Sequence, residues 1–283
     1  MRRGILLDHQ RKADGGPGIT LGSRNVLGIL PEIPKLGFRH LEIFLDPALD
    51  DPAERRWLVD FAARARDLGA DLWSMHVPFS RDVSVAGDAA REETVLGIES
   101  TIELAAAAGA RFAVVHPGSV TAPGEMPLRM ETSVRSLTRL NSFCRDHGIR
   151  LAVENMLPGH VGAGAAGLHA IIERLPHDAG VCFDTGHAHV TDGSTATALE
   201  VLAGRLYTLH VHDNDGTGDQ HLIPGDGTIR WNEVVGTLAR HGFQGVFMLE
   251  VSDRIRKRVP AEILRAAREA CDRFLPPVEA LPR

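Results

Sequence analysis

Short apolar runs of strand-forming residues alternate with longer segments of helical apolar spacing along almost the whole chain. This alternation predicts parallel strands joined by crossover helices. We count eight strand and helix pairs, and no linker or internal repeat divides them. Eight such pairs favour a barrel that closes on itself over an open sheet, and barrels of this kind run to about 250 residues. The expected fold is therefore α/β, a single (β/α)8 barrel of the TIM type.

The expected elements can be placed by residue number. The predicted strands are 4–7, 40–45, 71–76, 112–116, 150–154, 180–183, 206–212 and 245–250. The predicted helices are 25–36, 51–68, 89–108, 128–147, 168–175, 195–203, 231–241 and 260–274. We expect residues 1–283 to form one barrel domain, with residues 275–283 as a frayed, proline-rich C-terminal tail.

Composition excludes several classes of protein. Hydrophobic residues make up 43% of the chain and charged residues 24%, and no apolar run is long enough to span a bilayer. The first apolar run, 5–7, ends at Asp8 and is too short for a signal peptide, which predicts a cytoplasmic protein without a membrane partner. The cysteines, Cys144, Cys182 and Cys271, are widely spaced and are expected to be buried thiols. A net charge of −6 gives no general attraction to nucleic acid.

Polar residues stand at the C-terminal ends of the third to the eighth predicted strand. They are His76, His116, Glu154, Asp184, His210 and Glu250. Because the C-terminal strand ends of such a barrel surround the active site, these side chains are expected to converge on one pocket. Carboxylates so close together would repel one another without a cation. The sequence therefore predicts a metal centre at this end of the barrel.

The segment 181–227 is rich in histidine and aspartate. Imidazole and carboxylate groups together suit a divalent transition metal or zinc ion. No cysteine pair lies nearby, so a structural zinc site rich in cysteine is not expected. We expect a catalytic ion instead, manganese (Mn²⁺) or zinc (Zn²⁺), with cobalt (Co²⁺), iron (Fe²⁺) and magnesium (Mg²⁺) as alternatives.

Seven short motifs accompany these residues. They are HxPF at His76, HPG at His116, EN at Glu154, DTGH at Asp184, HxxD at His210, DxHxxPGxG at Asp219 and a strand ending LE at Glu250. In this combination the chain, from its second to its eighth strand, resembles the xylose-isomerase-like superfamily of TIM barrels. That superfamily holds sugar and sugar-phosphate isomerases and epimerases, together with AP endonucleases of the endonuclease IV type.

The resemblance implies a role for each residue. In the isomerases and epimerases one divalent ion is bound at the positions of Glu154, Asp184, His210 and Glu250. His187 there contacts the substrate. In the endonucleases three zinc ions are bound, and the additional ligands stand at the positions of His76, His116, His187, Asp219 and His221. All of these positions are filled in this chain.

We therefore expect a divalent-metal-dependent isomerase or epimerase that acts on a sugar or a sugar phosphate. Proton transfer next to a carbonyl passes through an enediolate, which the metal stabilises. Glu154 and Glu250 come from strands three steps apart around the ring and can approach opposite sides of the substrate. With His187 they form the expected catalytic set. The expected partner is a small carbohydrate, and the sequence leaves a homo-oligomer open.

Two other functions remain open. A zinc-dependent endonuclease acting on abasic DNA has the same ligands, but the loop 46–51 is acidic or apolar, which disfavours a nucleic-acid partner. A metal-binding barrel without catalysis is a second alternative. It is disfavoured because both glutamates required for proton transfer are present.

Some residues have an expected place but no fixed role. His212 shares strand parity with His210 and is expected to hydrogen-bond to a ligand. Glu42 faces the barrel interior or, if the register is shifted by one, a helix. The glycine-rich segments 8–24 and 159–167 are expected to cover the pocket as lids.

Overall fold

The computed structural model describes residues 17–22, 30–44, 52–252 and 260–275. Its strands form one parallel sheet in the order β7-β6-β5-β4-β3-β2-β1-β8. They are β1 (Pro17–Gly22), β2 (His40–Phe44), β3 (Asp71–His76), β4 (Phe112–Val115), β5 (Arg150–Glu154), β6 (Gly180–Asp184), β7 (Leu206–His210) and β8 (Phe247–Leu249). Apart from the step from β8 to β1, neighbours in the sheet are neighbours in the chain.

The two ends of the sheet meet at Val211, directly after β7. Its backbone N–H donates to the carbonyl of Met248 at 2.8 Å, and its carbonyl accepts from the N–H of Glu250 at 3.0 Å. These bonds close the barrel between β7 and β8. The predicted (β/α)8 barrel is thereby confirmed.

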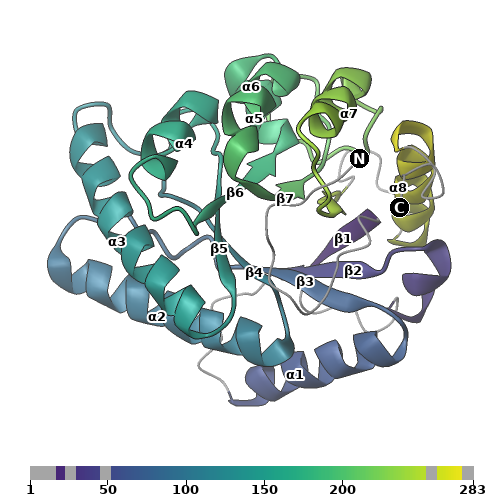
Figure 1. Ribbon diagram of the computed structural model, residues 1–283, viewed down its shortest axis with the longest axis horizontal. Helices are drawn as coiled ribbons and strands as arrows, with labels where there is room; N and C mark the ends of the chain where they lie inside the picture. The colour runs from purple at the N-terminus through teal and green to yellow at the C-terminus, as the bar shows by residue number, and fades with distance from the viewer. Residues whose placement is uncertain (1–16, 23–29, 45–51, 253–259, 276–283) are drawn as a thin grey trace.

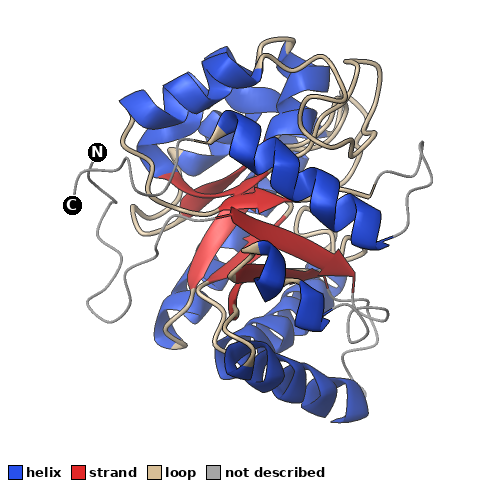
Figure 2. Cartoon of the chain, turned by 90° about the vertical axis from the view of Figure 1, so that its right-hand side faces the viewer, coloured by secondary structure: helices blue, strands red, loops and turns tan. Residues whose placement is uncertain are grey.

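Helices surround the sheet on its outside (Figures 1 and 2). They are α1 (Pro52–Asp67), α2 (Asp88–Ala108), α3 (Met126–Asp146), α4 (Gly164–Ile172), α5 (Thr185–Asp192), α6 (Thr195–Leu202), α7 (Trp231–Arg240) and α8 (Pro260–Phe274), with 3-10 turns η1 (Leu30–Glu32), η2 (Pro34–Leu36) and η3 (Ala203–Arg205). Longer helices bury apolar side chains in the core, as Leu58 of α1 and Leu137 of α3 illustrate. Full burial of one such side chain is worth about 1.5–3 kcal/mol.

The core has two parts. The larger lies between the strands and the helices. A smaller cluster, which includes Trp73, Phe112 and Tyr207, joins side chains of several strands. The strand register shifts at two places, so that Trp73 and Tyr207 each stand as an extra residue between paired neighbours. Such bulges re-aim the side chains that follow them along the strand.

The N-terminal elements differ from expectation. The predicted strand 4–7 lies outside the described residues, and β1 lies at Pro17–Gly22, inside the segment predicted as a lid. Glycines lie in and beside this short apolar run, so the sequence pattern did not indicate a strand there. Where a helix was predicted for residues 25–36, the described part forms the turns η1 and η2, because Pro31 and Pro34 interrupt a regular helix.

Two further differences concern helix α5 and the C-terminal tail. Helix α5 was not predicted, since it follows β6 without any loop and has only 8 residues. Of the predicted tail, only Leu275 lies within the described residues.

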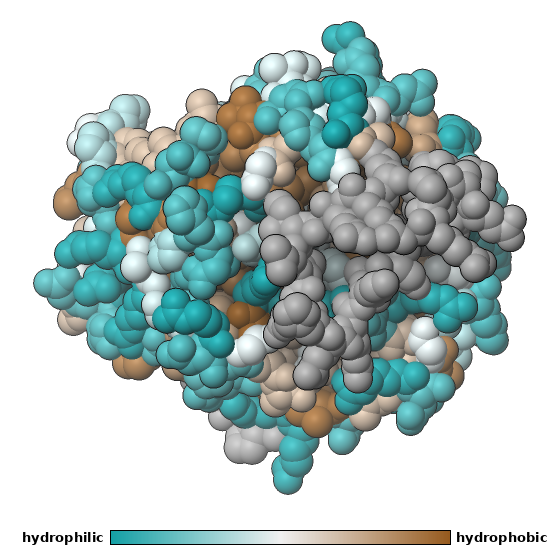
Figure 3. Space-filling view, viewed as in Figure 1, coloured by the Kyte–Doolittle hydropathy of each residue, from teal (hydrophilic) through white to brown (hydrophobic). Residues whose placement is uncertain are grey.

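The face shown in Figure 3 is mainly hydrophilic, with hydrophobic residues in small patches between polar ones. Among the described residues, the large hydrophobic side chains that are exposed include Phe79 and Val120. No helix among the described residues is long and apolar enough to cross a membrane.

Candidate metal centre and active site

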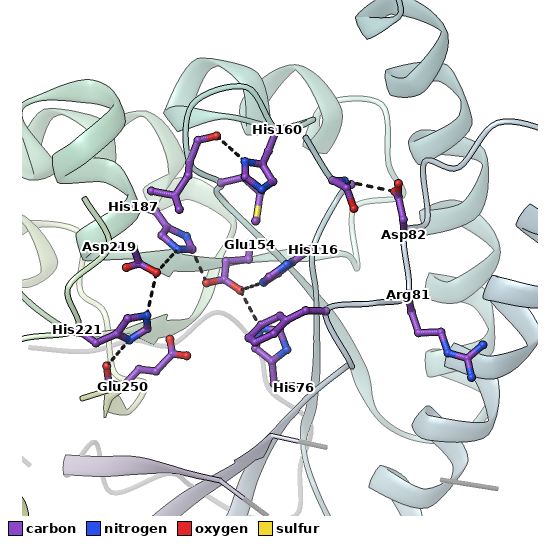
Figure 4. Close-up of a pocket in the computed structure, with 15 residues that line it drawn as sticks. His76, Arg81, Asp82, His116, Glu154, His160, His187, Asp219, His221 and Glu250 are labelled. Atoms are coloured by element: carbon purple, nitrogen blue, oxygen red, sulfur yellow. Dashed lines mark hydrogen bonds and ion pairs between the residues drawn. The ribbon is translucent and has the colours of Figure 1, made fainter. Parts of the chain in front are cut away.

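Glu154, at the end of β5, lies at the centre of the site (Figure 4). Its Oε2 is 3.1 Å from Nε2 of His76, at the end of β3, and 3.1 Å from Nε2 of His116, just after β4. Its Oε1 is 2.9 Å from Nδ1 of His210, at the end of β7. One buried carboxylate thus faces three imidazoles, which come from three different strand ends.

Four of the predicted ligands form one compact donor set. Glu154, Asp184, His210 and Glu250 each place one ligand atom within 4.8 Å of the others. Within this set, Nδ1 of His210 is 3.1 Å from Oε2 of Glu250. Three carboxylates and one imidazole at this spacing are a donor set that divalent manganese, iron, cobalt or zinc accepts. The residues present therefore fit a single divalent ion. We call this set of four residues the four-residue centre.

Asp184 connects this centre to helix α5. As the residue before the helix, it accepts a hydrogen bond at Oδ1 from the backbone N–H of His187 at 2.6 Å. The side chain of Asn155 holds the backbone of Asp184 from both sides, by accepting from its N–H at 2.7 Å and donating to its carbonyl at 2.9 Å. The neighbouring residue of Glu154 thus fixes the position of a second ligand.

His187, Asp219 and His221 form a neighbouring group. Nε2 of His221 is 2.9 Å from Oδ2 of Asp219, and Nε2 of His187 is 3.7 Å from the same oxygen. Nδ1 of His187 lies 2.9 Å from the carbonyl of Asn155, which as an acceptor keeps a hydrogen on that nitrogen. Its Nε2 therefore faces the cavity side of the site, where a substrate oxygen can reach it.

His212 is completely buried behind these residues. Its Nε2 lies 3.1 Å from Oδ2 of Asp184, the contact to a ligand that strand parity predicted. Its ring stacks on that of His221, with centroids 4.1 Å apart. The ring fits only because residue 186 is a glycine, where a Cβ would stand 2.0 Å from the imidazole.

Burial and neighbouring charges shift the pKa values of the side chains in the site. Burial lowers the pKa of His116 to about 4, which keeps this imidazole neutral. Burial also disfavours the charged form of His187, but Asp184 and Asp219 outweigh it and raise the pKa of His187 to about 10. Burial would raise the pKa of Glu154, yet His210 and His116 hold it well below its usual value. Burial raises the pKa of Glu250.

A cavity of about 260 Å³ opens onto the cluster. One part of the cavity is lined by Glu154, His187 and Glu250, and an apolar part of its wall is formed by Phe79 and Leu157. The remaining lining residues are His76, Arg81, Asp82, His116, Gly118, Ser119, Met156, His160, Asp219 and His221. The cavity has the size for a small molecule, below the roughly 300–1,000 Å³ of sites for drug-sized ligands.

All nine residues predicted from the strand ends and motifs are brought together by the fold. The sequence did not single out His160, which lies on the cavity wall in the segment predicted as a lid. Its Nδ1 lies 3.2 Å from the carbonyl of Leu157, so its Nε2 is left without a hydrogen and can accept from a hydroxyl. The one signal in the sequence for a role of His160 is its place in the loop that follows the strand ending at Glu154.

The chain is similar to known proteins in sequence and in fold. Residues 30–275 match the family described as "Xylose isomerase-like TIM barrel". An uncharacterized protein of Methanocaldococcus jannaschii is 32% identical over 202 residues, which cover 68% of each chain. Inosose dehydratase of Bacillus licheniformis is 28% identical over 161 residues, 49% of this chain and 52% of that protein. The chain thus spans about half the length of this dehydratase.

Solved structures of the same fold were also found. The crystal structure of a D-tagatose 3-epimerase-like protein superimposes with a TM-score of 0.78 at 25% identity and covers 91% of this chain and 97% of its own. The crystal structure of IolI protein with a bound zinc atom has a TM-score of 0.78 at 17% identity and covers 91% and 98%. At 17% identity, the similarity to IolI shows only that the two proteins share a fold.

Proposed function

Because the chain belongs to the xylose isomerase-like TIM barrel family, we propose that it is a sugar-modifying enzyme, a divalent-metal-dependent isomerase or epimerase of a sugar or sugar phosphate. Relatives named for an inosose and for D-tagatose support a small carbohydrate as the substrate. A cavity of about 260 Å³ beside the four-residue centre is in keeping with that size.

One observation carries the proposal. Two glutamates from strands on different sides of the barrel, Glu154 and Glu250, face the same imidazole nitrogen of His210 at 2.9 and 3.1 Å. Both carboxylates also line the cavity. A substrate carbon between them can lose its proton to one glutamate. Return of a proton from the other glutamate to the same carbon inverts its configuration, and return to the neighbouring carbon moves the carbonyl.

A divalent ion held by Glu154, Asp184, His210 and Glu250 would polarise the substrate carbonyl and stabilise the negative charge that develops beside it. Side chains of the protein bind and orient the substrate. Nε2 of His187 binds the substrate oxygen next to the reacting carbon, and the acceptor nitrogen of His160 orients a hydroxyl. Phe79 and Leu157 keep bulk water from the reacting carbon.

The proposal is tested by following hydrogen exchange at substrate carbons. The protein, supplied with Mn²⁺ or Zn²⁺, is incubated in deuterated water with a panel of ketoses and ketose phosphates, and NMR detects deuterium incorporation and new epimers. We expect turnover of at least one sugar. Glu154→Gln and Glu250→Gln should each lower its rate by ~100-fold or more, the range for loss of a general base.

Glu99→Gln is the matched control. Glu99 is also buried, but it pairs with Arg139 on the outer helices, 2.7 Å away, and not with the site. Its variant should exchange at the rate of the wild type. If Glu154→Gln and Glu250→Gln retain the full rate of exchange, proton transfer by these residues is excluded.

A second function has one observation in its favour. His76 and His116 share Glu154 as a further donor set, and His212, Asp219 and His221 form another, so the chain has donors for more than one ion. This supports the hydrolytic alternative, a zinc-dependent endonuclease on abasic DNA. Metal analysis and a cleavage assay distinguish the two: three zinc ions per chain and cut abasic duplex, without exchange of any sugar, would favour the nuclease.

A further inference from the structure

Glu42, in the middle of β2, is a fully buried carboxylate inside the barrel. The register of β2 and β3 pairs it with Ser74, whose hydroxyl donates to Oε2 of Glu42 at 2.5 Å. The interior orientation is thus the correct one of the two that the sequence left open. An ionised carboxylate in such a place needs partners that compensate for the loss of water.

The second partner of Glu42 is a predicted metal ligand. Oε1 of Glu42 lies 2.9 Å from Nε2 of His210. The other ring nitrogen, Nδ1, lies 2.9 Å from Glu154 and 3.1 Å from Glu250. The imidazole therefore bridges two environments, with Nδ1 in the four-residue centre and Nε2 on a carboxylate that belongs to no donor set found among the described residues.

The two nitrogens differ in what they face, because only Nδ1 lies beside the other predicted ligands. A neutral imidazole has a hydrogen on one nitrogen and a lone pair on the other. Nδ1 lies on the side of the predicted ligands Glu154 and Glu250, so a divalent ion held there would take its lone pair. The hydrogen of the neutral ring would then be on Nε2, and the carboxylate 2.9 Å from that nitrogen is Glu42. A carboxylate in this position also increases the basicity of the imidazole and holds its plane.

We propose that Glu42 is the positioning residue of the metal centre: anchored by Ser74, it holds His210 in the tautomer and orientation in which Nδ1 is the ligand atom. This inference rests on the proposed function in one respect, that His210 is a ligand of the divalent ion. It adds a residue that touches neither the ion nor the substrate. A purely structural Glu42 would stabilise the barrel without affecting the affinity for metal.

The test measures metal binding without any substrate, so it does not depend on knowing the sugar. Zn²⁺ affinity is measured by competition with a chelator for the full-length wild type and Glu42→Gln. Glutamine keeps the shape of the side chain and can still accept from Nε2, but it has no charge. We expect about 10–100-fold weaker Zn²⁺ binding, the usual cost of losing such a partner.

A spectroscopic measurement separates positioning from general stability. In the Co²⁺-loaded protein, the exchangeable Nε2–H proton of a ligand histidine gives a strongly shifted proton NMR signal. We expect this signal in the wild type with slow exchange against water, and at a changed position in Glu42→Gln. The visible absorption bands of Co²⁺ should shift in the same variant.

Two further variants complete the design. Ser74→Ala removes the anchor but leaves the carboxylate, and should weaken Zn²⁺ binding less than Glu42→Gln does. Glu99→Gln makes the same chemical change at a buried glutamate outside the site and should bind Zn²⁺ like the wild type.

The outcomes are distinct. A folded Glu42→Gln with wild-type Zn²⁺ affinity and an unchanged Co²⁺ spectrum overturns the inference while the proposed function stands. If Glu42→Gln does not fold, wild-type affinity in Ser74→Ala overturns it. A wild-type protein that binds neither ion overturns this inference together with the metal dependence of the proposed function.

Discussion

Gly186 is the position at which the site leaves least room for a side chain. A Cβ there would lie 2.0 Å from Cε1 and 2.4 Å from Nδ1 of His212. His212 is completely buried and stacked on His221, so its ring has no free space into which to move. The absence of a side chain at residue 186 is therefore what allows a histidine behind Asp184.

Gly186→Ala should consequently destabilise the protein by about 1–3 kcal/mol, the cost of overpacking a well-filled interior. It should also weaken metal binding, because His212 contacts Asp184. Urea unfolding followed by circular dichroism measures the first effect. Gly204→Ala is the control, since nothing lies within 4 Å of a Cβ there, and a near wild-type free energy of unfolding in both variants would contradict the packing argument.

Individual site residues were predictable to the extent that strands position them. Glu154 and His210 end strands whose apolar character is evident in the sequence, so their direction followed from the barrel. His160 lies in a loop, where no periodicity gives the direction of a side chain. The orientation of Glu42 depended on a strand register that shifts at Trp73, and such a bulge leaves no signal in the sequence.

At the scale of elements, β6 and α5 meet in a single residue. Asp184 ends the strand and also caps the helix, with Oδ1 on the N–H of His187. The helix thus begins at the four-residue centre itself and places His187 beside it. The sequence does not predict a helix directly after β6, because no loop residues separate the strand from the helix.

The double role of Asp184 predicts different results for two substitutions. Asparagine caps helices about as well as aspartate, whereas alanine does not, at a cost of about 0.5–2 kcal/mol. In the presence of a chelator both variants lose the charge that faces His187 and His212, so Asp184→Ala should be less stable than Asp184→Asn by that amount. Both variants should lose the bound ion, as metal analysis would detect. Full metal occupancy in Asp184→Ala would refute its place among the ligands.

At the scale of the whole molecule, the barrel does not depend on the ion for its core. Its strands and helices bury a continuous apolar cluster that surrounds the polar centre. The alternation of strands and helices was sufficient to predict this architecture, because each pair buries its apolar face in the same way. The first strand was missed because glycines surround a short run, Pro17–Gly22, that contacts β2 and β8.

Metal removal should therefore lower stability without unfolding the protein. A ligand present at 100 times its dissociation constant stabilises the folded state by about 2.7 kcal/mol. For a chain of this size, that corresponds to a rise in Tm of roughly 5–10 °C. Differential scanning calorimetry with Zn²⁺ and with a chelator measures the shift, and far-UV circular dichroism should be the same in both. Asp184→Asn should show no rise with Zn²⁺.

The closure of the barrel at Val211 has a consequence for local opening. Val211 stands between His210 and His212, and its two backbone bonds are shared with Met248 and with Glu250. The residues that close the barrel thus lie beside the four-residue centre, so an ion bound there would also stabilise the contact between β7 and β8. Amide hydrogen exchange would show this directly: the amides of Val211 and Glu250 should gain protection together when Zn²⁺ binds, while the strands on the opposite wall keep their rates.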